Sequence, residues 1–306
     1  MVDCKEPSID AARSPRDSAR IRGVVIDEAS PLFAALAALA REARLVFFAG
    51  LPGTGKSLLI RELAYLAHRR GRRIHLLQWD VARPVFEASD AGRLYPQERG
   101  ITHGLIRLAV GRWARAAVAR WHKVHPAFDD LLIGETPFIG HRLIELARPG
   151  RDEAEPVLAA PSTRFVIPVP SRALREHVEA ERMRRTQAPL HPREREDAPP
   201  DVLRALWGEV ATVAGALGVT SAAAGYDPDV YRRVYERLLA RRHAQALPLD
   251  TRLPTGDVSA YDVRVTTTEL LPSPAETAQF IHEVEASHPG PPDVGRAIDG
   301  WYHPPA

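Results

Sequence analysis

Eight consecutive residues carry the clearest chemical pattern in the chain. They read Gly50-Leu51-Pro52-Gly53-Thr54-Gly55-Lys56-Ser57 and match G-x-x-x-x-G-K-[ST] at every fixed position. In this pattern backbone N–H groups surround a polyphosphate, the lysine reaches its outer phosphates, and the hydroxyl holds Mg²⁺. We therefore predict that these residues and Leu58 bind nucleotide phosphates, with Lys56 catalytic and Ser57 a ligand of Mg²⁺.

A carboxylate at the end of the segment 131–135 is the second candidate. Ligands of open α/β sheets lie beyond the carboxyl ends of the strands, so Glu135 is expected to hold Mg²⁺ opposite Ser57. Asp129 and Asp130 stand at the start of the same predicted strand and are therefore less favoured. The alternative is that Glu135 only interacts with the dipole of a helix expected over residues 138–148.

Asp80 ends a further predicted strand, residues 74–80. A carboxylate one strand away from the phosphate loop can accept the proton of an attacking hydroxyl, which would make Asp80 catalytic. Two alternatives stay open, namely that Asp80 caps the segment that follows, or that it binds Mg²⁺ itself.

A charged helix, predicted from residue 172 to about 186, leads into a proline-rich loop that ends near residue 200. Such a segment suits a mobile lid whose arginines stabilise the charge of a transferred phosphoryl group. The arginines in question are Arg182, Arg184 and Arg185, with Arg193 and Arg195 behind them. We predict that Arg182 and Arg185 are catalytic. The alternative is a solvated helix face with ion pairs between residues i and i+4.

Five more basic side chains are candidates for an acceptor pocket, although each also has a structural interpretation. They are Arg83, Arg107, Arg112, His141 and Arg142.

Composition limits the classes of protein that the chain can represent. Among its 306 residues the net charge is only +2, which argues against nucleic acid as a partner. The single cysteine, Cys4, excludes disulfide frameworks and multi-cysteine metal sites, and the twelve histidines show no H-E-x-x-H or comparable spacing. Neither a membrane-spanning apolar run nor a signal-peptide core is evident, so we expect a cytoplasmic location without membrane association. Nothing indicates the oligomeric state.

The elements needed to position these residues alternate along the chain. An apolar run at 44–49 precedes the phosphate loop, and leucines at helical spacing follow it until Gly71. This alternation predicts a three-layer α/β/α P-loop sandwich with a parallel sheet. Its parts are expected to be a mobile leader at 1–29, one domain at 30–288 with a lid at about 171–200 and a helical insertion at about 201–246 before a last strand at 261–271, and a proline-rich tail at 289–306.

In this order, Gly50 to Ser57, Asp80, Glu135 and Arg182 to Arg185 resemble the P-loop kinases of small molecules, the group of P-loop NTPases that contains nucleoside, shikimate and gluconate kinases. The resemblance covers roughly residues 44 to 190, and only the loop is a specific motif. It implies ATP with Mg²⁺, and transfer of the γ-phosphoryl group to a hydroxyl of a small-molecule acceptor. The region from about 201 to 260 has no counterpart in a minimal kinase.

The chief rival is a P-loop ATPase that switches or drives a protein partner, with the extra helices as a docking surface. A GTPase is disfavoured because the chain contains no asparagine for an Asn-Lys-x-Asp motif. A motor-type ATPase would close its aliphatic strand on Asp-Glu, and residues 131–135 lack that pair.

Overall fold

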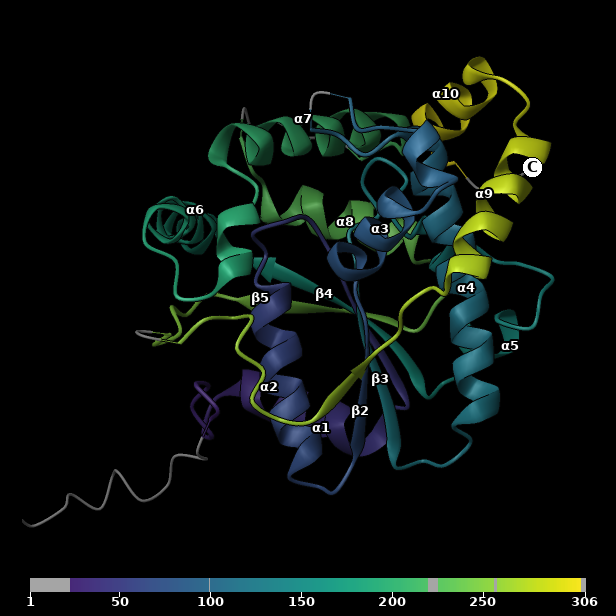
Figure 1. The fold of residues 1–306 in the computed structure, drawn as a ribbon. Coiled ribbons are helices and arrows are strands. Elements are labelled where there is room, and N and C mark those ends of the chain that lie inside the picture. The colour runs from purple at the N-terminus through teal and green to yellow at the C-terminus, as the bar shows by residue number, and fades with distance from the viewer. Residues whose placement is uncertain (1–22, 99, 220–224, 256–257, 304–306) are drawn as a thin grey trace, which may run out of the picture.

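A six-stranded parallel sheet forms the centre of the molecule (Figure 1). The computed structural model describes residues 23–98, 100–219, 225–255 and 258–303. The strands are β1 (Leu45–Ala49), β2 (Arg73–Leu77), β3 (Asp130–Thr136), β4 (Thr163–Pro170), β5 (Ala244–Leu249) and β6 (Thr267–Glu269). They lie in the order β5-β4-β1-β3-β2-β6, and every pair is parallel.

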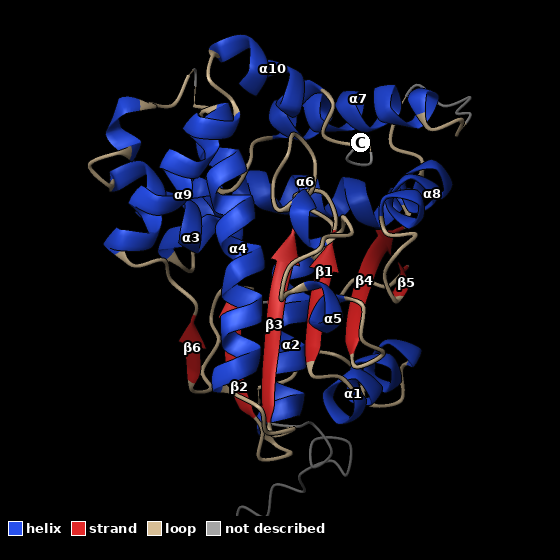
Figure 2. Ribbon diagram, turned by 90° about the vertical axis from the view of Figure 1, so that its right-hand side faces the viewer, coloured by secondary structure: helices blue, strands red, loops and turns tan. Residues whose placement is uncertain are grey.

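Helices cover both faces of this sheet, as an α/β fold requires (Figure 2). They are α1 (Pro31–Glu42), α2 (Lys56–His68), α3 (Trp79–Ala88), α4 (Gly104–Val124), α5 (Glu155–Leu158), α6 (Arg172–Gln187), α7 (Pro200–Ala216), α8 (Pro228–Leu238), α9 (Pro274–Ser287) and α10 (Pro291–Asp299). The arrangement is consistent with the three layers that the sequence predicts.

The alternation of side chains along β1 divides the core between the two faces. Val46 and Phe48 pack with α1 and α2, whereas Leu45 and Phe47 face the cluster that includes Trp113 of α4. Each of these strand residues is almost completely buried. Burial on both faces explains why β1 is a continuous apolar run rather than an alternating one.

The connections leave β1 and β3 in opposite directions. From β1 the chain passes through α2 to β2 on one side, whereas from β3 it passes through α5 to β4 on the other. A crevice therefore opens between the carboxyl ends of β1 and β3, which is the place where open α/β sheets bind ligands.

Several predicted boundaries differ from the structure. Strand β5 was not predicted, and the helices α7 and α8 precede it rather than the last strand. The expected strand at 261–271 shortens to β6, since only Thr267–Glu269 pair with β2. The helix expected over 138–148 is wrong: this segment is a turn with left-handed backbone, followed by one short 3₁₀ turn at 144–146.

Both ends of the described chain are more ordered than predicted. The tail expected from residue 289 instead contains α10, whose Val294 is buried, and continues to the buried Trp301. Of the expected mobile leader, residues 1–22 lie outside the described part. Its last residues bind the domain, because the N–H groups of Val25 and Ile26 donate to the Glu62 carboxylate. Ser30 caps α1, because its side chain accepts a hydrogen bond from the N–H group of Phe33.

Within the described ranges, no helix combines the length and the apolar character that crossing a bilayer requires.

Candidate functional site

The loop from Gly50 to Ser57 connects the carboxyl end of β1 to the first turn of α2. Gly53 and Gly55 have φ angles of +77° and +88°, a left-handed conformation that side chains disfavour. Within the described residues, none of the backbone N–H groups from Gly53 to Leu58 donates to a backbone carbonyl. The loop thus presents unpaired donors at the positive end of a helix dipole, an arrangement that binds anions.

Side chains around the loop hold its shape. The Lys56 ammonium and the Thr54 hydroxyl each donate to the carbonyl of Leu51, both at 2.9 Å. From α6, Arg175 donates to the carbonyl of Pro52 at 2.9 Å. Arg175 was not singled out from the sequence, because the segment contains several arginines and only the fold shows which of them reaches the loop.

Tyr231 of α8 supports the loop from behind. A methyl group at Gly50 would lie 2.2 Å from the Tyr231 hydroxyl, and Tyr231 is completely buried. The helical region from 201 to 246 therefore contributes directly to the shape of the loop.

Substituting Gly50 by alanine should lower the free energy of unfolding by about 1–3 kcal/mol, since the new methyl group overlaps the Tyr231 hydroxyl. Urea unfolding measures this change. Gly208→Ala is the matched control, because a methyl group there meets no atom within 4 Å and alanine favours the helix α7. Equal stability of the two variants would contradict the close packing of Tyr231 on the loop.

Glu135 and Lys56 both lie buried at this end of the sheet, and each acts on the pKa of the other. Glu135 lies in β3 in register with Phe48 of β1, and each of the two charged residues is only 6% exposed. Burial, followed by the negative charge of Asp80, raises the pKa of Glu135 to about 7. Burial likewise lowers the pKa of Lys56 to about 8, against the opposing effect of Glu135. An acid and a base with opposite pKa shifts within one cleft are typical of functional sites.

The raised pKa of Glu135 predicts a pH dependence of stability. Because the folded-state pKa exceeds the ordinary value of 4.5, ionisation of Glu135 disfavours the folded state, starting above pH 4.5 and complete above pH 7. Glu135→Gln removes this loss. The unfolding free energy of the variant minus that of the wild type should therefore increase by about 1–3 kcal/mol between pH 5 and pH 8. Loss of its carboxylate partner lowers the pKa of Lys56 further, which acts in the same direction.

Urea unfolding at the two pH values measures this difference. Glu153→Gln serves as the control, since the Glu153 side chain is 71% exposed and pairs with Lys123 on the surface. A difference for Glu135→Gln that stays flat, or that decreases with pH, would show that the folded state does not hold Glu135 in its neutral form.

Asp80 lies in the first turn of α3, which follows β2, the strand next to β3. The strand β2 ends at Leu77, so Asp80 follows the strand rather than ending it as predicted. The residue is exposed, and its charge raises the pKa of both Glu135 and Lys56. The structure thus brings a solvent-accessible carboxylate close to the loop lysine.

The arginines of α6 differ in their partners. Arg182 pairs with Asp197 at 3.2 Å, and its charge reaches both Lys56 and Glu135. Asp197 also accepts a 2.6 Å hydrogen bond from Tyr261, which fastens the end of the predicted lid to the segment after β5.

The other lid arginines are bound elsewhere. Arg184 and Arg185 both pair with Glu181 on their own helix, as the alternative interpretation predicts. Arg193 donates to Gln78 at 3.2 Å, and its charge also reaches Glu135. Among the arginines that the sequence singled out, Arg182 is therefore the one whose charge acts on both Lys56 and Glu135.

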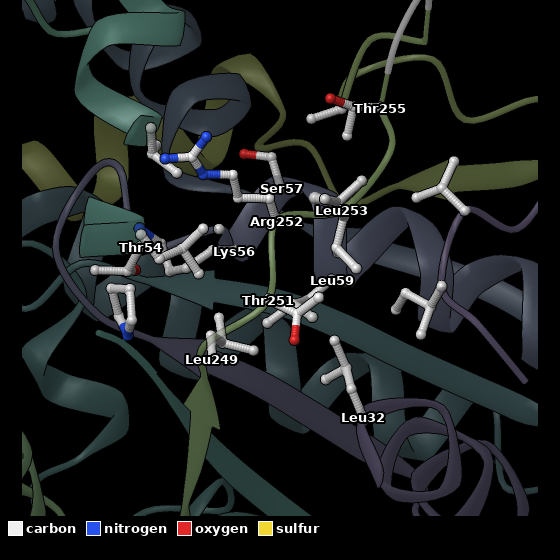
Figure 3. A pocket seen from close by; sticks show the side chains of 18 of the residues that line it. Leu32, Thr54, Lys56, Ser57, Leu59, Leu249, Thr251, Arg252, Leu253 and Thr255 are labelled. Atoms are coloured by element: carbon white, nitrogen blue, oxygen red, sulfur yellow. The ribbon is translucent and has the colours of Figure 1, made fainter. Parts of the chain in front are cut away.

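A cavity of about 1090 Å³ adjoins the loop, and Lys56 and Ser57 lie on its wall (Figure 3). Three further segments enclose it: residues 24–32, the α6 face that carries Arg182 and Arg185, and residues 247–255. Leu32, Leu249 and Leu253 supply apolar surface (Figure 3). The sequence did not reveal this cavity, because its walls come from segments far apart in the chain.

All five candidate acceptor residues bond to other groups of the fold, and Arg107 and Arg142 are described below. The two ring nitrogens of His141 contact Glu145 Oε1 at 2.7 Å and the Ala297 carbonyl at 3.1 Å. Arg83 pairs with Glu87 one turn along α3 at 2.8 Å. Arg112 donates to the carbonyl of Glu283 and to the hydroxyl of Ser287, and so joins α4 to α9.

At the opposite end of the sheet, the fold gathers side chains that sequence spacing did not connect. His75, His125 and Asp130 offer atoms that all lie within 4.8 Å of one another. Arg73 binds both carboxylate oxygens of Asp130, at 2.8 and 2.7 Å, and together with His75 lowers the pKa of Asp130 to about 2. Because Arg73 already supplies the balancing positive charge, we assign this cluster a structural role.

Comparison with known proteins identified no relative of the chain. A scan against models of protein families gave no match, and searches of curated proteins and of solved structures found no matching protein.

Proposed function

We propose that the protein is an ATP-dependent phosphotransferase, which moves the γ-phosphoryl group of Mg·ATP to a hydroxyl group of a small molecule. The observation that carries this proposal is the row of unpaired N–H groups at the start of α2, which opens at the switch point of the sheet beside buried Glu135. Backbone donors at a helix start bind phosphate, and a nearby carboxylate and hydroxyl are ligands that Mg²⁺ prefers.

Each residue of the site has a role in this proposal. The N–H groups from Gly53 to Leu58 and the Lys56 ammonium bind the phosphates, and Ser57 and Glu135 hold Mg²⁺, directly or through water. When bound, Mg²⁺ neutralises charge that develops on the phosphate oxygens. Arg182 approaches from α6 and stabilises the same charge.

Asp80 accepts the proton of the acceptor hydroxyl as its oxygen bonds to the γ-phosphorus. The bond from that phosphorus to the β–γ bridging oxygen breaks, and the electron pair leaves with ADP. Asp80 then releases the proton to solvent, with which its exposed position is compatible.

The cavity beside the loop suits the nucleoside part of ATP. Its volume of about 1090 Å³ exceeds what a single nucleoside needs, and its apolar walls match the character of ligand pockets. The α6 segment from Ser171 to the 187–200 loop is the lid in this proposal, since it borders the cavity and supplies Arg182.

Incubation with γ-labelled ATP and a fractionated pool of small metabolites tests the proposal. We expect label to appear in one metabolite fraction as a new phosphorylated compound. A second incubation replaces the metabolites by fractions of cellular protein. If label appears only as inorganic phosphate, and if a protein fraction increases its release, the chain acts as a switch ATPase.

A further inference from the structure

Two arginines, one from α4 and one from the turn itself, lie side by side at the turn after β3. Arg107 of α4 donates through Nη1 to the carbonyl of Gly140 at 2.8 Å, and through Nε to the carbonyl of Thr102 at 2.9 Å. Arg142 donates through Nη1 to the carbonyl of Ile139 at 2.8 Å. Both guanidinium groups are thus fixed by backbone carbonyls, which are neutral acceptors.

The separation of the two guanidinium groups is small. A methyl group at Gly140 would lie 2.9 Å from Arg142 Nη1 and 3.1 Å from Arg107 Nη1, so the sum, about 6 Å, is the largest distance that these two nitrogens can have. Gly140 has a φ of +61° and no side chain, and both features let the turn admit the pair.

The backbone of this turn is unusual in other ways. Phe138, His141 and Leu143 all have φ angles between 61° and 64°, a region that residues other than glycine rarely adopt. Strain of this kind is found where a structure must place particular groups, and functional sites are enriched in it. Here it turns the chain back, so that Arg142 pairs with Phe138 through two backbone hydrogen bonds.

The charges of the pair are not balanced by a direct ion pair. Among the described residues, no carboxylate oxygen lies within 4.0 Å of either guanidinium group. Burial, and then the like charge of Arg142, lower the pKa of Arg107 to about 10. Glu209 of α7 is the acidic group with the largest opposing effect on both arginines. Two adjacent, partly buried cations repel each other, and an anion between them would remove that cost.

The position of the pair links it to the proposed reaction. The turn begins two residues after Glu135, and Figure 2 shows β3 running up toward it from the sheet. The charge of Asp80 also acts on Arg142. A molecule with its hydroxyl at Asp80 could therefore place a second group on the arginines.

We infer that Arg107 and Arg142 form a binding site for an anionic group of the acceptor, a phosphate or a carboxylate. The identity of the ligand as the acceptor rests on the proposed function. The anion site itself rests on the geometry of the turn. Planar guanidinium groups bind both oxyanions through paired N–H donors.

Calorimetric titration with inorganic phosphate, and separately with acetate, tests the anion site. The protein is first saturated with Mg²⁺ and a non-hydrolysable ATP analogue, which covers the donors of the 50–57 loop. We expect one anion or both to bind, and Arg107→Gln or Arg142→Gln to weaken binding roughly tenfold to a hundredfold. Arg142→Lys should keep part of the affinity, and Arg112→Gln, on the same helix as Arg107, should keep all of it.

Glu209→Gln tests the site without touching the arginines or the turn. Glu209 has no hydrogen bond or ion pair among the described residues, so the variant should fold normally. Loss of its negative charge should tighten anion binding severalfold. If the wild type binds neither anion, or if the arginine variants bind as well as the wild type, the inference is wrong. Should the ATP analogue fail to bind, the proposed function fails, and the same titrations on the protein alone still decide the anion site.

An anion-exchange step before the transfer reaction tests the anion site and the kinase activity separately. The metabolite pool is divided into retained, anionic compounds and unretained ones before γ-labelled ATP is added. Label in the retained fraction supports both the kinase activity and the anion site. If phosphatase treatment of the pool abolishes this label, the anionic group of the acceptor is a phosphate rather than a carboxylate. Label only in the unretained fraction contradicts the inference while supporting the kinase, and label in neither contradicts the kinase.

Discussion

Replacing Lys56 by alanine should reduce the turnover of ATP by roughly 10²- to 10³-fold, the loss that follows removal of one group that stabilises transition-state charge. Lys56 is the first residue of α2, and its ammonium lies buried beside Glu135. Without this cation, the buried carboxylate would face the phosphates with no positive side chain between them. Mg·ATP binding should weaken as well, which calorimetry can measure alongside steady-state turnover.

The chain offers a matched control for this variant. Lys123 is exposed and pairs with Glu153 on the surface, so Lys123→Ala removes the same charge far from the loop. Lys123→Ala should keep the thermal stability of the wild type, whereas Lys56→Ala loses the hydrogen bond to the Leu51 carbonyl, so its turnover is measured below its own unfolding transition. If Lys56→Ala retains turnover within a few fold of Lys123→Ala, the loop does not act on phosphate.

Asp80→Asn should lower phosphoryl transfer by roughly 10²- to 10⁴-fold while Mg·ATP binding stays nearly unchanged. The substitution keeps the shape of the side chain and removes its capacity to accept a proton. Asp80 is exposed in the first turn of α3, so the fold does not depend on it. Transfer is measured as labelled product, and binding by calorimetry.

The alternatives for Asp80 give different patterns. An equal loss of binding and transfer would mean that Asp80 holds Mg²⁺ or shapes the site instead. Asp90→Asn, two residues beyond the end of the same helix and with a fully exposed side chain, should change neither quantity.

The elements that the sequence predicted correctly are those in which the local pattern and the fold agree. The strand β1, the loop and the helix α2 follow from a fixed motif between an apolar run and a helical leucine pattern. Glu135 was favoured over Asp130 because only the exit of a strand faces a ligand, and the structure places Asp130 at the other end of β3, bound to Arg73.

The failures have a common physical cause, namely that long-range contacts override local propensity. Residues 138–148 have helical composition, yet hydrogen bonds from Arg107 and within the turn stabilise a left-handed backbone there. Strand β5 escaped prediction because four of its six residues are not buried and Pro248 interrupts its pattern. The role of Tyr231 depends on which elements meet in the fold and cannot be read from spacing, whereas the pairing of Arg184 and Arg185 with Glu181 follows the spacing of one helix turn.

A crystal structure with Mg²⁺ and a non-hydrolysable ATP analogue tests the central claim most directly. The account predicts that the triphosphate lies on the N–H groups from Gly53 to Leu58, with Mg²⁺ near Ser57 and Glu135. The nucleoside should occupy the cavity between residues 24–32 and 247–255. A complex with the triphosphate elsewhere, or no binding of the analogue at saturating concentration, would contradict it.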